Sequence, residues 1–181
     1  MKVLPTAIAD VMILEPRVFE DERGFFLESW NARALAAALG FEVSFVQDNH
    51  SGSRHGVLRG LHYQIMQPQA KLVHVVRGRV FDVAVDLRRS SPAFGHWTGT
   101  ELSAENRRQA FVPAGFAHGF LVLSETADVL YKTTDYYAPQ HERCLIWNDP
   151  EVGVAWPLTG EPVLAAKDRI GLRLREVDTF E

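Results

Sequence analysis

Hydrophobic residues occupy every second position over long parts of the middle of the chain, and the stretch 81–87 (FDVAVDL) is the clearest case. A period of two is typical of a β-strand whose two faces meet different surroundings. The stretch 71–76 precedes it across Arg77-Gly78, and together the two stretches predict a β-hairpin. Two further strands are expected over 120–123 and 128–135, with residues 124–126 turning between them.

Only one segment has the pattern of a helix. Residues 32–39 (ARALAAAL) favour it, Asn31 can cap its start, and Gly40 can end it. The last part of the chain is richer in proline and charge, which predicts loops and a short helix packed on the sheets. Many short strands separated by glycine and proline favour a closed barrel or jelly roll. No linker or repeat interrupts the chain, so residues 1–181 are expected to form one domain.

Composition narrows the classes of function. With 46% hydrophobic and 23% charged residues, the chain resembles an ordinary globular protein, and its net charge of -4 gives no reason to expect nucleic acid or an acidic membrane as partner. Cys144 is the only cysteine, so no disulfide can form within the chain. The start of the chain (MKVLP) lacks the apolar run of a signal peptide, and no stretch is long enough for a membrane span. A cytoplasmic protein is expected.

The stretch 113–119 (PAGFAHG) is the first chemical signal. Pro-x-Gly-x-x-His between two strands is half of the signature of the cupins, small double-stranded β-helix barrels. Metal-binding cupins add a His-x-His pair, but here the corresponding residues are His62-Tyr63-Gln64, so too few ligands remain for a transition metal. No metal and no cofactor are therefore expected. Taken alone, His118 is also explained as a loop histidine bonded to backbone.

A second signal lies in the stretch 56–64 (GVLRGLHYQ), where Arg59 stands three residues before His62 and Lys71 follows soon after. These cations suit a substrate with phosphates and a developing oxyanion. Strict alternation would place Arg59 and His62 on opposite faces of the strand. A bulge at Gly60 would bring both side chains to the same side.

Together these segments closely resemble the dTDP-4-dehydrorhamnose 3,5-epimerase family, cupin-type enzymes that act on nucleotide sugars. The resemblance follows the whole chain in order, through 23–28 (RGFFLE), 45–51 (FVQDNHS), 57–64 (VLRGLHYQ), 80–88 (VFDVAVDLR), 112–120 (VPAGFAHGF), 131–137 (YKTTDYY), 141–143 (HER), 147–150 (WNDP) and 167–168 (KD). It implies a mainly β, cupin-type jelly roll with a few short helices.

The resemblance also implies catalytic roles. His62 resembles the general base that removes the protons at C3 and C5 of a keto sugar, and Asp168 resembles the carboxylate that orients its imidazole. Lys71 resembles the cation beside the C4 oxygen, and Tyr131 resembles the acid on the opposite face of the sugar. From pattern alone, Lys71 is equally a solvated residue at a strand start, Tyr131 a core tyrosine, and Asp168 a helix cap or a surface charge.

The substrate-binding residues are implied in the same way. Gln47 and Asn49 share one face of a regular strand, with Asp48 pointing away. Tyr137 resembles an aromatic platform for thymine, and Glu28 a nucleotide contact that reaches the site of a neighbouring subunit. The full implied set is Arg23, Glu28, Gln47, Asn49, Arg59, Lys71, His118, Tyr137, Glu142 and Lys167. Plain solvation is the alternative for each of the charged members.

The reaction implied is the epimerisation of dTDP-4-dehydro-6-deoxy-D-glucose at C3 and C5, through enolates, to dTDP-4-dehydro-β-L-rhamnose in dTDP-L-rhamnose biosynthesis. The family also implies a homodimer that exchanges N-terminal strands, for which the stretch 12–14 (MIL) is a candidate. A relative that epimerises one carbon only is the nearest alternative. A metal-dependent cupin oxygenase and a non-catalytic sugar-nucleotide-binding barrel are more distant alternatives.

Overall fold

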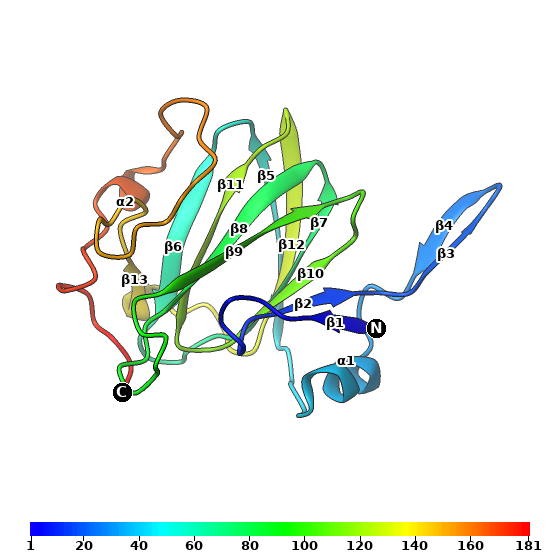
Figure 1. The fold of residues 1–181 in the computed structure, drawn as a ribbon, viewed down its shortest axis with the longest axis horizontal. Coiled ribbons are helices and arrows are strands. Elements are labelled where there is room, and N and C mark those ends of the chain that lie inside the picture. The colour runs from blue at the N-terminus through cyan, green and yellow to red at the C-terminus, as the bar shows by residue number, and fades with distance from the viewer.

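The computed structural model describes residues 1–181 and shows two β-sheets packed face to face as a jelly roll (Figure 1). Neighbouring strands in both sheets run antiparallel. The first sheet has the order β1 (Lys2–Leu4), β2 (Met12–Glu15), β10 (Gln109–Val112), β7 (Lys71–Arg77), β12 (Thr126–Thr133) and β5 (Gln47–Arg54). The second has the order β13 (Glu142–Cys144), β6 (Leu58–Gln64), β11 (Phe116–Val122), β8 (Arg79–Asp86) and β9 (Trp97–Ser103). The mainly β, cupin-type fold predicted from the sequence is confirmed.

Two of the three hydrophobic clusters lie one on each face of the second sheet. Between the sheets, Val73 and Val75 of the first pack with Val80 and Phe120 of the second. On the outer face of the second sheet, a separate cluster includes Trp156 from the C-terminal segment. Because both faces are covered, every residue of β11 is buried, and so are Asp82 and Asp86 of β8.

The predicted hairpin between 71–76 and 81–87 is wrong. Both strands form, but β7 belongs to the first sheet and β8 to the second, so the turn between them is a corner from one sheet to the other. Gly78 makes this corner with φ of 72°, and a Cβ there would overlap the carbonyl oxygen of Thr126. The chain makes a second corner after β11, which begins at Phe116 and is longer than the predicted 120–123.

The predicted helix is confirmed as α1 (Ala32–Leu39). The Asn31 side chain accepts a hydrogen bond from the backbone N–H of Ala34, and Gly40 closes the helix in the left-handed conformation. Leu35 and Leu39 pack on the outer face of the first sheet. The C-terminal segment contains the expected short helix, α2 (Ala166–Arg169), and a 3₁₀ turn, η1 (Pro139–His141), stands before β13. None of the helices is both long and apolar enough to cross a membrane.

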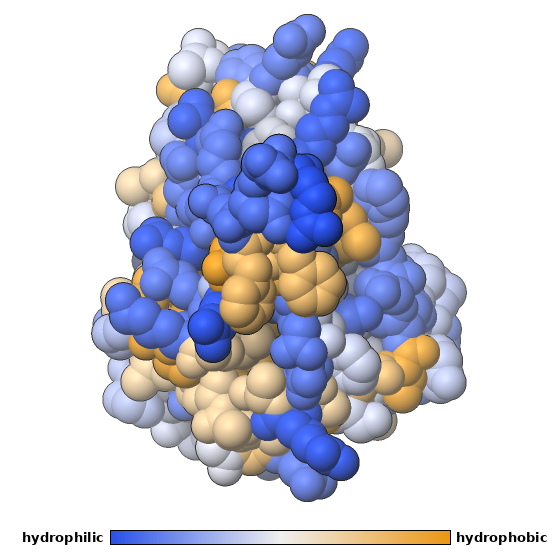
Figure 2. All heavy atoms as spheres, turned by 90° about the vertical axis from the view of Figure 1, so that its right-hand side faces the viewer, coloured by the Kyte–Doolittle hydropathy of each residue, from blue (hydrophilic) through white to orange (hydrophobic).

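A two-stranded arm, β3 (Val18–Asp21) paired with β4 (Gly24–Leu27), projects from the body (Figure 1). Its phenylalanines remain exposed, with Phe19, Phe25 and Phe26 at 49%, 60% and 66%. Figure 2 views the molecule from the side on which the arm projects, and it shows apolar residues gathered on an otherwise hydrophilic face. The stretch 12–14 lies in β2, where it pairs with β1 and β10 of its own chain.

Candidate active site

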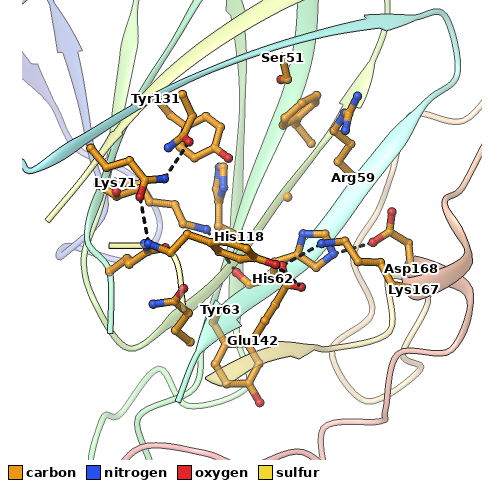
Figure 3. Close-up of a pocket in the computed structure, with 18 of the residues that line it drawn as sticks. Ser51, Arg59, His62, Tyr63, Lys71, His118, Tyr131, Glu142, Lys167 and Asp168 are labelled. Carbon is orange, nitrogen blue, oxygen red and sulfur yellow. Dashed lines mark hydrogen bonds and ion pairs between the residues drawn. The ribbon is translucent and has the colours of Figure 1, made fainter. Parts of the chain in front are cut away.

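A cavity of about 350 Å³ opens between the two sheets, and polar side chains from both sheets converge in it (Figure 3). The first sheet supplies Gln47, Asn49, Ser51, Lys71, Tyr131 and Thr133, the second supplies Arg59, His62, His118 and Glu142, and the C-terminal segment adds Lys167 and Asp168. A cavity into which several polar side chains converge is a candidate binding or active site.

A β-bulge in β6 brings Arg59 and His62 to the same cavity. His118 of β11 stands opposite His62, whereas Phe120 stands opposite Arg59, so two residues of β6 face one residue of β11. Gly60 has φ of 121°, and a Cβ there would lie 2.6 Å from the Cα of Gly119. The bulge that the sequence suggested at Gly60 is therefore confirmed, and it needs glycine on both strands.

His62 is held by a carboxylate. Its Nε2 lies 2.5 Å from Oδ1 of Asp168, which is only 2% exposed, whereas the His62 side chain is 21% exposed toward the cavity. Asp168 reaches this position because α2 folds the C-terminal segment back over β6. A buried carboxylate that bonds one ring nitrogen orients the imidazole and stabilises its protonated form.

Cys144 completes a group with His62 and Asp168, in which the three potential ligand atoms lie within 4.8 Å of one another. Burial raises the pKa of the Cys144 thiol to about 12, so the thiol is protonated at neutral pH. His62 and Asp168 are already bonded to each other. This donor set fits a histidine–carboxylate pair beside an unreactive thiol better than a metal centre, because metal ligation requires a thiolate.

Lys71 is a cation placed almost entirely inside the protein. Its side chain is 8% exposed, and Nζ donates a hydrogen bond to the backbone carbonyl of His62 at 3.3 Å. Burial lowers the pKa of Lys71 to about 8, while the charges of Asp82 and Glu142 partly oppose this shift. A desolvated ammonium next to the base is well suited to stabilise negative charge that develops on a substrate oxygen.

Tyr131 reaches the cavity from the opposite sheet. It stands on β12 of the first sheet, whereas His62 stands on β6 of the second (Figure 3). Burial raises the pKa of the Tyr131 hydroxyl above its ordinary value, so it keeps its proton at neutral pH. The cavity therefore has a base on one side and a proton donor on the other.

Hydrogen-bonded polar side chains line the remaining part of the cavity. Gln47 donates to Oδ1 of Asn49 at 2.8 Å and accepts from the backbone N–H of Tyr137 at 2.9 Å. Glu142 accepts from the Tyr137 hydroxyl at 3.3 Å and pairs with Lys167 at 2.8 Å. As the alternation predicted, Asp48 points to the outside, where it pairs with Lys132.

A family model described as dTDP-4-dehydrorhamnose 3,5-epimerase matches residues 5–176. The chain belongs to this family. It is 63% identical to the dTDP-4-dehydrorhamnose 3,5-epimerase of Pseudomonas aeruginosa over 99% of both chains. It is 50% identical, with a TM-score of 0.95, to the Legionella pneumophila dTDP-6-deoxy-D-glucose-3,5-epimerase solved with dTDP-4-keto-L-rhamnose, over 98% of this chain and 94% of that one.

A more distant member of the fold group acts on one carbon. The 3'-monoepimerase of Streptomyces bikiniensis, solved with dTDP-quinovose, is 35% identical to this chain with a TM-score of 0.88, over 94% of this chain and 87% of that one. The 3,5-epimerase family that the sequence resembles is thus confirmed, as is the assignment to the isomerases.

Two of the residues implied by the 3,5-epimerase resemblance lie outside the cavity of this chain. Arg23 is at the turn of the arm, where it pairs with Asp21 and is 85% exposed. Glu28 follows β4 and accepts a hydrogen bond from Asn31. The other implied residues line the cavity: Gln47, Asn49, Arg59, His62, Lys71, His118, Tyr131, Tyr137, Glu142, Lys167 and Asp168.

The 3,5-epimerase site also contains residues that the sequence reasoning missed. Ser51 follows Gln47 and Asn49 on the same face of β5, so the alternation that identified those two would have identified it. The Ser51 hydroxyl and the Asn49 amide nitrogen are buried without a partner. Asp82, which stands behind the cavity and pairs with His118 at 2.8 Å, gave no signal, because its partner lies on another strand.

Proposed function

We propose that this chain epimerises dTDP-4-dehydro-6-deoxy-D-glucose at C3 and C5, giving dTDP-4-dehydro-β-L-rhamnose. One observation carries the proposal: a histidine–carboxylate pair and a protonated tyrosine face the same cavity from opposite sheets. Inversion at a carbon beside a ketone requires a proton to leave one face of the sugar and another to arrive on the opposite face. A base and an acid on opposite walls provide this directly.

In the proposed reaction, His62 removes the proton from C3 and then from C5. Asp168 keeps the imidazole in position and stabilises the imidazolium that each removal creates. The two electrons left on carbon move to the C4 oxygen, and the Lys71 ammonium stabilises the resulting enolate. Tyr131 then donates its proton to carbon from the other side, and the inverted ketone is restored. Before the second removal, His62 releases its proton to solvent and Tyr131 regains one from solvent.

The nucleotide is proposed to occupy the part of the cavity lined by Gln47, Asn49 and Tyr137. The amide groups suit a base and a sugar, and the exposed ring of Tyr137 offers a flat face for thymine. Arg59 is proposed to bind the diphosphate, and Lys167, Glu142 and His118 the hexose end. The unpaired groups of Asn49 and Ser51 support binding here, since buried polar atoms normally find partners.

Arg23 and Glu28 are assigned to the cavity of a second copy in a homodimer. Both lie on or beside the arm formed by β3 and β4, and that arm carries three exposed phenylalanines away from its own cavity. Burying these rings against a partner would remove apolar surface from water. The proposed location of the enzyme is the cytoplasm, in line with a single free cysteine that lies partly buried.

Incubation with the keto sugar nucleotide in deuterium oxide tests the function. A 3,5-epimerase introduces deuterium at both C3 and C5 and inverts both centres, which mass spectrometry and NMR of the product detect. Deuterium and inversion at one centre would identify the single-carbon activity of the Streptomyces bikiniensis relative instead. Binding of the nucleotide without any exchange would identify a binding barrel and overturn the proposal. His62→Ala serves as the inactive control.

A further inference from the structure

Behind the cavity lies a second histidine–carboxylate pair, formed by His118 and Asp82. Nε2 of His118 is 2.8 Å from Oδ2 of Asp82, and the two side chains are 7% and 3% exposed. His118 stands on β11 directly opposite His62. Asp82 stands on β8, the next strand of the same sheet, and does not line the cavity.

Asp82 occupies a position where a carboxylate is costly. Its neighbours on the same face of β8 are Val80 and Ala84, which belong to the apolar core between the sheets. A leucine or valine there would extend that core, whereas an ionised carboxylate must be compensated by hydrogen bonds or charges. His118 is the one side chain that bonds it. The stability of the sheet therefore does not explain why position 82 is an aspartate and not an apolar residue.

The hydrogen bond determines which ring nitrogen of His118 carries the proton. A carboxylate can only accept, so Nε2 must be the donor, and in the neutral ring Nδ1 then has a free lone pair. No other group of the protein bonds Nδ1. When its ring is neutral, His118 therefore presents a hydrogen-bond acceptor of defined orientation for a hydroxyl group of the sugar.

We propose that Asp82 is a positioning residue of the epimerase, which acts through His118 and sets the polarity of the cavity beside Lys71. The inference rests on the function proposed above and adds a second carboxylate to it. The negative charge of Asp82 also acts on Lys71. Two further charged groups act on Lys71, Glu142 of β13 and Lys167 of α2. Among these groups, Asp82 has the largest effect in favour of the ammonium form of Lys71.

Asp82→Asn is the informative variant, because it keeps the shape of the side chain and removes its charge. The asparagine oxygen can still accept from Nε2 of His118, so the variant removes the charge that strengthens this hydrogen bond, which typically reduces an activity by about tenfold. We expect this loss in kcat, with binding of dTDP unchanged in calorimetry, since the nucleotide end of the cavity is remote. We also expect the alkaline limit of the pH profile to move to lower pH.

Two controls separate a positioning role from a structural one. Asp149→Asn changes an equally buried carboxylate, which accepts backbone N–H groups of Glu151 and Leu174 far from the cavity, and should leave kcat and the pH profile unchanged. In a His118→Gln background, Asp82→Asn should have no further effect on kcat, because residues that act as a unit are not additive. Additive losses would overturn the inference.

A measurement on the unmodified protein keeps the test independent of folding of the variants. Nitrogen-15 NMR of the histidine rings, assigned with His118→Gln, should show a protonated Nε2 and an unprotonated Nδ1 for His118 at pH 8. The reverse tautomer would refute the proposed role of Asp82. An unmodified protein that exchanges no deuterium into the keto sugar would instead refute the function and leave this NMR result standing.

Discussion

Lys71 shows how a single residue acquires a property that its position in the sequence does not reveal. On pattern alone it resembles a solvated lysine at the start of a strand, yet the fold buries it between two sheets beside His62. Burial without a close carboxylate partner weakens the ammonium form, and the nearby charges of Asp82 and Glu142 restore only part of it. Its charge is therefore sensitive to pH near neutrality.

We expect kcat to fall as the pH rises through about 8, the value to which burial lowers the pKa of Lys71. Below this pH the ammonium is present and stabilises the enolate, and above it the neutral amine does not. A pH–rate profile checks this expectation, with circular dichroism at each pH as control for unfolding. Constant activity up to pH 10 would show that the reaction does not need the charge of Lys71.

Tyr131→Phe separates the acid from the base. The change removes the hydroxyl but keeps the ring, and His62, Asp168 and Lys71 remain to form the enolate. The proton then returns from His62, so deuterium should enter the sugar with retention of configuration, while inverted product falls by about 10²–10⁴-fold. NMR of the recovered sugar nucleotide gives both quantities. Loss of exchange together with inversion would assign Tyr131 to substrate positioning.

Gln64 occupies the place where metal-binding cupins carry their second histidine. Its amide is engaged by the chain itself, donating to the carbonyls of Gln67 and Tyr136 and accepting from the N–H of Ala138. We therefore expect prolonged chelation to leave turnover unchanged and elemental analysis to find no stoichiometric metal. Activity that is lost on chelation and restored by one divalent ion would contradict this.

At the scale of elements, β6 and β11 approach so closely that both need glycine where they meet. A Cβ at Gly119 would overlap the carbonyl oxygen of Arg59 and lie 3.1 Å from the Cα of Gly60. The contact fixes the bulge, and the bulge in turn sets the directions of Arg59 and His62. The positions of Arg59 and His62 in the cavity therefore depend on the pairing of β6 with β11.

Gly119→Ala should push β6 away from β11 and displace both side chains. We expect a loss of stability of about 1–3 kcal/mol, typical of overpacking, together with a marked fall in kcat. Gly160→Ala is the matched control, because a Cβ at that loop position meets no atom within 4 Å. Urea unfolding and steady-state kinetics measure the two effects. Normal activity in Gly119→Ala would show that the bulge tolerates a shift.

The elements also show what a sequence can and cannot predict. Period-two alternation correctly placed the strands around 71–76 and 81–87, and the cap at Asn31 correctly placed α1, because these signals are local. The pairing of strands is not local, so β7 and β8 were wrongly expected to pair with each other. For the same reason Gly60 predicted a bulge, whereas Asp82 behind His118 was invisible until the strands were assembled.

At the scale of the whole molecule, the arm is the part whose apolar side chains a single chain does not bury. Its phenylalanines are exposed, and Arg107 of the body contacts it, with the guanidinium 4.2 Å from the Phe25 ring centroid and a 2.6 Å ion pair to Glu20. The arm is thus held in a defined direction without being covered. This arrangement suits insertion against a second copy.

Replacing Phe25 and Phe26 together by serine should convert the proposed homodimer into monomers, which analytical ultracentrifugation detects. Turnover should fall as the dimer is lost, because Arg23 and Glu28 would no longer reach the cavity of a second copy. Replacing the exposed Ile170, which lies away from the arm, controls for the general loss of surface hydrophobicity. A wild-type protein that sediments as a monomer with full activity would refute this role of the arm.

The corners after β7 and β11 have a consequence for how the chain reaches its fold. Because strands that are adjacent in sequence enter different sheets, β7 finds its partners in β10 and β12, tens of residues away. Loops must close before any of these pairs is stabilised, which makes such topologies fold slowly, in milliseconds to seconds. The pairs formed by strands adjacent in sequence, β1–β2, β3–β4 and β8–β9, include neither β6, which carries His62, nor β12, which carries Tyr131. His62 and Tyr131, on strands of different sheets, therefore come to one cavity only when the two sheets pack together.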